Sequence, residues 1–267
     1  MTFNPYTGCD HDCVYCYASS YIPNFSKCRQ KKNLLQRLQQ EARNLKGETI
    51  SIANSSDPYP CLEAKNELTR GSLKILVNSN CRIQLVTKSD LVVRDKDLLS
   101  KVPSTVSLTI TTDDAKLARL LEPHAPTPEL RLRAAEDLTN KGIPVSVRID
   151  PIIPFINDQP KKLAATLASI GVKHVTSSTY KLKPDNWRRI SNTLPNKAEK
   201  LKPLYFKQGD KIGGNTLLPK DFRFKLMKKT RDLVTSNGMQ FGVCREGLAE
   251  LNTASCDGSW LLDAYPR

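Results

Sequence analysis

The sequence predicts an α/β fold built on a parallel sheet, and two observations lead to that prediction. Short segments rich in β-branched residues alternate with amphipathic helical segments between residues 33 and 179. This repetition is typical of parallel strands joined by crossover helices. The chain also has 267 residues, 39% of them hydrophobic, which is enough for one large α/β domain with a buried core.

The strands follow one another in a regular order. Five are expected at residues 49–52, 82–87, 106–110, 145–149 and 172–179, and a sixth, shortened strand at residues 1–4 precedes them. Helices are expected at residues 33–45, 68–77, 128–141 and 161–170. The first places Leu34, Leu38 and Ala42 on one face. The third has Pro128 at its start and Gly142 just after its end, as helices commonly do.

The pattern changes after Thr179. Residues 181–210 are rich in Pro, Lys and Asn, and a long amphipathic helix at 219–236 and a short strand at 240–244 follow. We therefore expect residues 1–180 to form the core of the fold. Residues 181–267 are expected to be a basic extension that packs on this core.

The charge of the chain points to an anionic partner. Lys and Arg number 41 against 27 Asp and Glu, a formal charge of +14. Nucleic acid is the usual partner of such a protein, although a solvated lysine-rich surface explains the same composition. The first four residues are too few and too polar for a signal peptide, and no apolar run approaches the roughly 18 residues of a membrane span. We expect a cytoplasmic monomer that does not engage a membrane.

Three cysteines near the start of the chain carry the strongest chemical signal. Cys9, Cys13 and Cys16 have the spacing C-x3-C-x2-C. On a single tetrahedral metal, three thiolates leave one coordination position open. On a [4Fe–4S] cluster, they leave one iron without a protein ligand. A zinc site completed by His11 or by a distant cysteine is the alternative. A disulfide is disfavoured because the cysteines are crowded and nothing indicates export.

The sequence around these cysteines is N-P-Y-x-G-C-x-H-x-C-x-Y-C-Y-A over residues 4–18. It resembles the cysteine motif of the radical S-adenosylmethionine (AdoMet) superfamily. Within this superfamily, the motif is similar to that of the spore photoproduct lyase-like branch, also described as DNA repair photolyase-like. The resemblance implies a partial (β/α)6 TIM-like barrel with the cysteine loop after the first strand. It also implies a [4Fe–4S] cluster that cleaves AdoMet to a 5′-deoxyadenosyl radical, and an electron donor such as ferredoxin or flavodoxin.

Residues at the ends of the expected strands are candidates for binding AdoMet. The resemblance assigns this role to Ser56 with Asp57, to Lys88 in a T-K-S segment, and to Ser107 on the following strand. Parallel barrels place their sites at these carboxyl ends. Tyr15, beside the last cysteine, joins the same set.

Two further segments extend the set. Glu122 and Arg131 lie in a run similar to the branch's L-E-P-x-A-P-x6-R pattern. Glu122 would bind AdoMet with Arg131 as its partner, or the two would form a structural ion pair. Arg148 ends a strand, and a buried Arg needs a carboxylate, which Asp150 or a substrate would supply.

Three other cysteines are candidate catalytic residues. Cys244 and Cys256 lie in Gly-rich surroundings twelve residues apart, and Cys61 follows the strand-end segment with Ser56. They would donate a hydrogen atom, hold a second metal centre, or be unreactive thiols. In spore photoproduct lyases the hydrogen donor is a cysteine within that strand-end segment, where this chain has Ser55 and Ser56. This departure argues against thymine-dimer repair as the reaction.

The sequence therefore predicts a radical AdoMet enzyme that abstracts hydrogen from its substrate. Charge and resemblance together favour a nucleic acid, with DNA lesion repair and RNA modification both open. One alternative is a radical AdoMet enzyme acting on a protein, peptide or small molecule. The other is a zinc-binding nucleic-acid module without catalysis.

Overall fold

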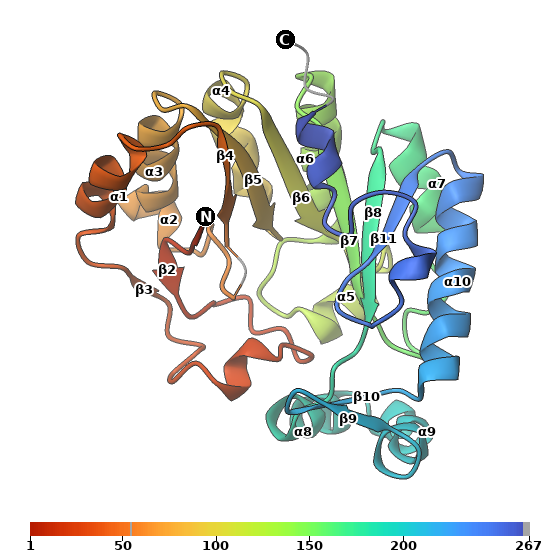
Figure 1. The fold of residues 1–267 in the computed structure, drawn as a ribbon. Coiled ribbons are helices and arrows are strands. Elements are labelled where there is room, and N and C mark those ends of the chain that lie inside the picture. The colour runs from red at the N-terminus through yellow and green to blue at the C-terminus, as the bar shows by residue number, and fades with distance from the viewer. Residues whose placement is uncertain (54, 264–267) are drawn as a thin grey trace.

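A single open sheet organises the molecule. In the computed structural model, which describes residues 1–53 and 55–263, seven strands follow the order β1-β4-β5-β6-β7-β8-β11, and each neighbouring pair is parallel (Figure 1). The strands are β1 (Thr2–Phe3), β4 (Glu48–Ile52), β5 (Cys81–Thr87), β6 (Ser104–Thr109), β7 (Val145–Ile152), β8 (His174–Thr179) and β11 (Gln240–Val243). The α/β prediction is confirmed, and the open sheet is consistent with an incomplete barrel. It has a seventh strand because the segment expected at 240–244 pairs with β8.

Helices connect the strands and cover one face of the sheet (Figure 1). They are α1 (Leu34–Ala42), α2 (Glu63–Asn66), α3 (Leu68–Leu76), α4 (Lys96–Leu99), α5 (Ala115–Leu121), α6 (Pro128–Asn140), α7 (Lys161–Ser169), α8 (Pro184–Thr193), α9 (Pro195–Phe206) and α10 (Lys220–Ser236). The four helices expected before residue 180 are α1, α3, α6 and α7. The amide of Leu130 donates to Thr127 Oγ1 at the start of α6, where Pro128 is the first helical residue.

The two faces of the sheet carry different side chains. Because side chains alternate along a strand, one face gathers apolar residues that pack against the helices, among them Ile83, Leu85, Val106, Leu108, Val147, Val175 and Phe241. The opposite face is polar and includes Gln84, Ser107, Thr109, Ser146, Arg148, His174 and Thr176. The larger apolar cluster of the protein therefore lies on the helix side of the sheet.

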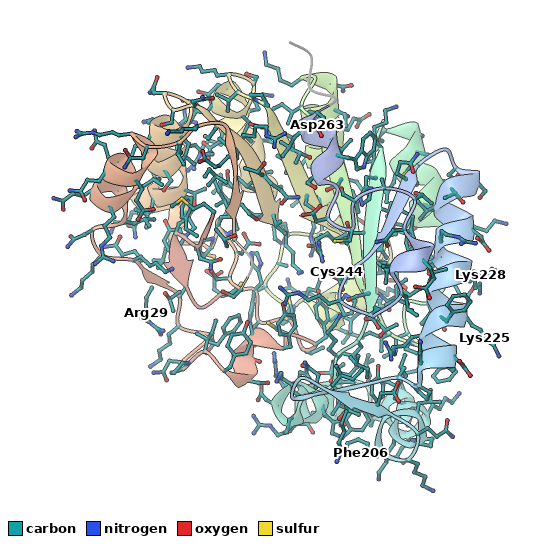
Figure 2. The ribbon with its side chains drawn as sticks, in the orientation of Figure 1. Arg29, Phe206, Lys225, Lys228, Cys244 and Asp263 are labelled. Carbon is teal, nitrogen blue, oxygen red and sulfur yellow. The ribbon has the colours of Figure 1, made fainter. Side chains whose placement is uncertain are left out.

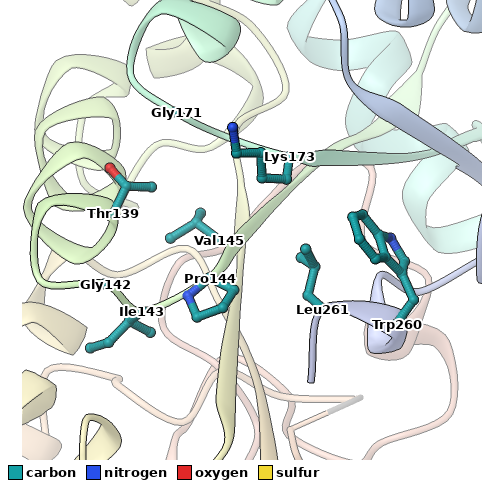
Figure 3. Close-up of a pocket in the computed structure, with 9 residues that line it drawn as sticks. All are labelled: Thr139, Gly142, Ile143, Pro144, Val145, Gly171, Lys173, Trp260 and Leu261. Atoms are coloured by element: carbon teal, nitrogen blue, oxygen red, sulfur yellow. The ribbon is translucent and has the colours of Figure 1, made fainter. Parts of the chain in front are cut away.

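The polar face is covered at the amino ends of its strands by the C-terminal segment. Trp260 Nε1 donates to His174 Nδ1 at 3.2 Å, and Gln84 Nε2 donates to the Asp257 carbonyl at 3.0 Å. The backbone passes so closely that a Cβ on Gly242 would lie 2.7 Å from the Cα of Cys256. A pocket of about 370 Å³ opens beside Trp260 and Pro144 at this same end (Figure 3). It is separate from the carboxyl ends, where parallel-sheet proteins place their active sites.

The stretch after β8 is more ordered than its composition suggested. It contains α8, α9 and a hairpin of β9 (Asp210–Ile212) and β10 (Asn215–Leu217). A second apolar cluster joins this stretch, through Ile190, Leu201 and Tyr205, to Val14 and Tyr15 of the cysteine loop. The extension thus packs on the loop, whereas β11 belongs to the main sheet. A domain boundary at residue 180 stays a prediction. Among residues 1–53 and 55–263, no helix has the length and apolar character needed to cross a membrane.

Candidate active site

The cysteine loop follows β1 and is held by backbone contacts at both ends. The amide of Cys9 donates to the Phe25 carbonyl at 2.8 Å, and the amide of Val14 donates to the Leu121 carbonyl at 2.9 Å. Gly8 has φ +81°, and a Cβ there would lie 2.4 Å from the Phe25 oxygen, so only glycine fits. A short pairing of β2 (Tyr6–Thr7) with β3 (Arg29–Gln30) closes the outer side of the loop.

Two of the three thiols, those of Cys9 and Cys13, lie in an environment that disfavours free thiolates. Burial raises the pKa of Cys13 to about 12, with Lys88 acting in the opposite direction. Burial, together with Asp57, raises the pKa of Cys9 as well. A bound metal holds such thiols deprotonated. In the part of the chain that the structure describes, no three His, Cys, Asp or Glu side chains meet around a single ion. A cluster with several irons takes its thiolates at different irons. Three thiols in one loop, two of them buried and that of Cys16 half-buried, fit such a cluster.

Lys88 places a cation directly beside the cysteine loop. Its Nζ lies 5.6 Å from the centre of the Tyr15 ring, and its charge acts on both Cys9 and Cys13. Asp57 fixes the backbone here by accepting from the Lys88 amide at 2.8 Å and from Thr87 Oγ1 at 2.6 Å. The Asp57 carboxylate thereby orients the end of β5, and Lys88 remains available to face a bound group.

Glu122 and Arg131 form the ion pair that the sequence suggested, and both are buried. Arg131 Nη1 lies 2.6 Å from Glu122 Oε2, while the Tyr15 hydroxyl and Thr111 Oγ1 donate to Oε1. Burial alone would raise the pKa of Glu122, but Arg131 and Lys88 outweigh burial and hold this pKa below its usual range. The carboxylate therefore stays charged and fixes the Tyr15 ring beside the cysteines.

Two serines of the predicted AdoMet set differ in their contacts. Ser56 Oγ donates to the Tyr6 carbonyl at 2.9 Å, which ties the segment after β4 to the start of the cysteine loop. Ser107 Oγ on β6 is buried and has no hydrogen-bond partner. A buried hydroxyl without a partner is costly, so Ser107 fits a site that a ligand completes.

A second polar group lies on β7, β8 and the end of β11. Arg148 Nη2 donates to Asp150 Oδ2 at 2.6 Å, so Asp150 supplies the carboxylate that the buried Arg requires. Burial, Asp257 and Cys244 raise the pKa of Cys256, and Arg148 opposes them. Thr176 Oγ1 on β8 donates to the Cys256 carbonyl at 3.2 Å, and the Cys244 amide donates to the carbonyl of the next residue of β8 at 2.9 Å. Thr176 in turn is the register partner of Arg148 on β7. Cys244 lies near the middle of the molecule (Figure 2). The two C-terminal candidate thiols are thus neighbours of each other and of a cation.

Cys61, the third candidate thiol, lies elsewhere. It is exposed, and its amide donates to Asp10 Oδ2 at 2.8 Å, on the outer side of the cysteine loop. Among the predicted residues the structure thus forms two groups, one around Lys88 and Tyr15 and one around Arg148.

Several residues that hold the loop were not assigned this role from the sequence. Arg189 and Asn186 on α8 donate to backbone carbonyls of the loop. The Tyr6 hydroxyl donates to the buried Glu63 at 2.6 Å, and His11 Nδ1 faces Asp57 Oδ2 at 3.6 Å.

The sequence matches the Radical SAM superfamily over residues 3–190. The chain belongs to this superfamily: it is an enzyme, and its cofactors are AdoMet and an iron–sulfur cluster. It is 36% identical over 210 residues to an uncharacterized protein of Methanocaldococcus jannaschii, covering 71% of this chain and 78% of that protein. An uncharacterized protein of Mycobacterium tuberculosis is 28% identical over 193 residues, covering 67% and 57% respectively.

The fold is similar to that of spore photoproduct lyase. A structure of a variant of that enzyme with bound AdoMet and dinucleoside spore photoproduct has a TM-score of 0.66, with 18% identity over 88% of this chain and 72% of that chain. The predicted superfamily, α/β fold and cofactors are confirmed, and family membership favours the cluster over the zinc alternative. The individual AdoMet ligands stay predictions.

Proposed function

We propose that this radical AdoMet enzyme acts on nucleic acid, either repairing a DNA lesion or modifying RNA. When bound, the cluster supplies the electron that breaks the C5′–S bond of AdoMet. A ferredoxin or flavodoxin would deliver that electron. The polar face at the carboxyl ends of the strands would receive the substrate next to the cysteine loop.

The charge of the surface around α9 carries this proposal. The structure describes every residue of the stretch 195–212. This stretch has one exposed carboxylate, Glu199, and five exposed lysines: Lys197, Lys200, Lys202, Lys207 and Lys211. The exposed ring of Phe206 packs edge-on against Trp187 with 5.1 Å between ring centres. Figure 2 places Phe206 at the α8–α9 end of the molecule, the end toward which the strands run. Cations beside an exposed aromatic ring suit a phosphate backbone with stacked bases.

The polar residues of the site would have two roles, one in binding AdoMet and one in reaction with the substrate radical or in binding a second metal. Lys88, Ser107, Ser56, Tyr15, Glu122 and Arg131 would hold or orient AdoMet at the cysteine loop. The unpartnered hydroxyl of Ser107 supports this assignment. Cys244 and Cys256, beside Arg148, would return a hydrogen atom to the substrate radical or hold a second metal.

Anaerobic reconstitution tests the chemistry. The protein loaded with iron and sulfide, then given AdoMet and a reductant, is expected to release 5′-deoxyadenosine, and Cys13→Ala is expected to release none. Adding labelled DNA, RNA and peptide pools in turn identifies the substrate class by transfer of label. Product formation from peptide alone would overturn the nucleic-acid proposal.

Salt-dependent binding tests the surface. Replacing Lys200, Lys202 and Lys207 together by Gln is expected to weaken DNA or RNA binding. The slope of log affinity against log salt should fall by about 2–3, near 0.9 for each lost phosphate contact. The matched control replaces Lys220, Lys225 and Lys228, three exposed lysines of α10, by Gln. Equal loss in both triple variants would show that only total charge matters and would reject the α9 surface.

A further inference from the structure

We infer that Arg189 is a positioning residue for the iron–sulfur cluster. It lies on α8, beyond the part of the sequence that carries the cysteine motif. Its Nη1 donates to the Cys13 carbonyl at 2.6 Å, and its Nη2 donates to the Cys16 carbonyl at 2.9 Å. One guanidinium therefore bridges the backbone oxygens of two cluster ligands, a bidentate geometry for which Arg is suited.

Asn186, one turn earlier on α8, completes the contact. Its Nδ2 donates to the Tyr15 carbonyl at 3.1 Å, and the side chain is fully buried. The hydroxyl of Tyr180 donates to Asn186 Oδ1, which fixes the orientation of the amide. A single face of α8 thus holds the backbone oxygens of residues 13, 15 and 16.

These contacts set the geometry of the loop between the second and third cysteines. The Cys13 carbonyl also accepts from the Cys16 amide at 3.0 Å, which closes a tight turn. Arg189 further donates to Ser19 Oγ at 2.6 Å, just after the loop. Without the guanidinium, the Cys13 carbonyl keeps only the Cys16 amide as a partner and the Cys16 carbonyl keeps only Ser19 Oγ, at 2.9 Å. The spacing of the two thiols is then less constrained.

The charge of Arg189 has a second consequence. Reduction adds negative charge to a cluster, and cations or hydrogen bonds around it shift its potential. Asp185 Oδ2 at 3.3 Å and Asp12 Oδ1 at 3.9 Å partly balance this cation. Removing the guanidinium leaves both carboxylates near the loop, so reduction becomes harder.

The test compares Arg189→Gln with Arg188→Gln. Arg188 also pairs with Asp185, at 3.1 Å, but its side chain is 73% exposed. The two variants therefore lose the same charge from adjacent positions, and only one of them loses the loop contacts. After anaerobic reconstitution, Arg189→Gln is expected to show a more negative midpoint potential in an EPR-monitored titration. It should also lose iron to a chelator about tenfold faster, the scale of one charge-assisted hydrogen bond.

Arg188→Gln is expected to match the wild type in both measurements. If both variants shift equally, or neither does, the positioning role is wrong. Should Arg189→Gln fail to fold, Arg189→Lys replaces it in the test, because Lys keeps the charge but cannot bridge both carbonyls. The midpoint potential of the cluster in this variant should stay close to that of the wild type, and iron should still be lost faster. A Lys variant identical to wild type in iron loss would overturn the inference. Neither readout involves a substrate, so a failed nucleic-acid proposal leaves this test intact.

Discussion

The two faces of the central sheet differ in how their buried side chains are satisfied. On β6, Val106 and Leu108 are fully buried in the apolar core beneath the helices. Between them, Ser107 points to the opposite face, where its hydroxyl is equally buried and has no partner. The hydroxyl of Ser146, which pairs with Ser107 across β6 and β7, is also buried without a hydrogen-bond partner. The helix face is built for stability, and the polar face gives up stability for positions that a ligand can use.

The polar face itself differs from end to end. At the amino ends of the strands, His174 is sealed by Trp260 and by Thr176, which lies 3.2 Å from its Nε2. At the carboxyl ends lie the cysteine loop and the Arg148 group. At the sealed end His174 is thus paired with protein side chains, although Ser146 beneath Gly258 has no hydrogen-bond partner. Ser107 on the neighbouring strand also has no partner.

The largest effect is expected on the apolar face. Leu108→Ala should lower the free energy of unfolding by about 2–5 kcal/mol, because it leaves a cavity in a fully buried site. Urea denaturation followed by circular dichroism measures it. AdoMet affinity, measured where both proteins are folded, should change little. A strong loss of affinity in the folded variant would show that the two faces are not independent.

A pH-dependent effect is expected at the sealed end. Burial lowers the pKa of His174 to about 4, so the folded state keeps this ring neutral. The unfolded state binds a proton below about pH 6.5, and stability should therefore fall as pH drops from 6.5 toward 4, by about 1.4 kcal/mol per pH unit. At pH 5 the loss relative to pH 7 is about 2 kcal/mol.

The check is the urea midpoint of wild type and of His174→Gln at pH 7 and pH 5. Gln retains a hydrogen-bonding side chain and does not titrate, so the His174 contribution should vanish from the difference between the two pH values. The same pH dependence in both proteins would show that His174 is not its source. Asp257 and Arg148 also act on His174, but their charges do not change between pH 5 and pH 7, because the pKa of Asp257 is lowered and that of Arg148 is raised.

The sequence was most informative where a local pattern decides the structure. The strands of the main sheet, the helices α1, α3, α6 and α7 and the cysteine loop follow from short-range periodicity or spacing, whereas the shorter helices α2, α4 and α5 were not expected. The Glu122–Arg131 pair also followed, because both residues lie in one short segment. Lys88 was expected at the active end, and it lies beside Cys9 and Cys13.

What the sequence did not reveal depends on contacts between distant segments. Arg189 meets Cys13 across 176 residues, and no local pattern distinguishes it from the neighbouring Arg188. The pairing of β11 with β8 likewise depends on the chain returning after α10. The resemblance gave Asp57 a role in binding AdoMet, which stays a prediction. That its carboxylate accepts from Thr87 and Lys88 depends on the folded backbone and was not visible in the sequence.

The smallest effect separates the two unpartnered serines of the polar face. Ser107→Ala removes a buried hydroxyl that has no partner, so stability should change by no more than about 0.5 kcal/mol or rise slightly. If Ser107 binds AdoMet, affinity should fall about tenfold, the value of one hydrogen bond. Ser146→Ala is the matched control, because a Cβ on Gly258 of the C-terminal segment would lie 3.0 Å from its Cβ and the residue is sealed from the site. Isothermal titration of the reconstituted proteins with AdoMet distinguishes them, and equal affinities in both variants would remove Ser107 from the AdoMet site.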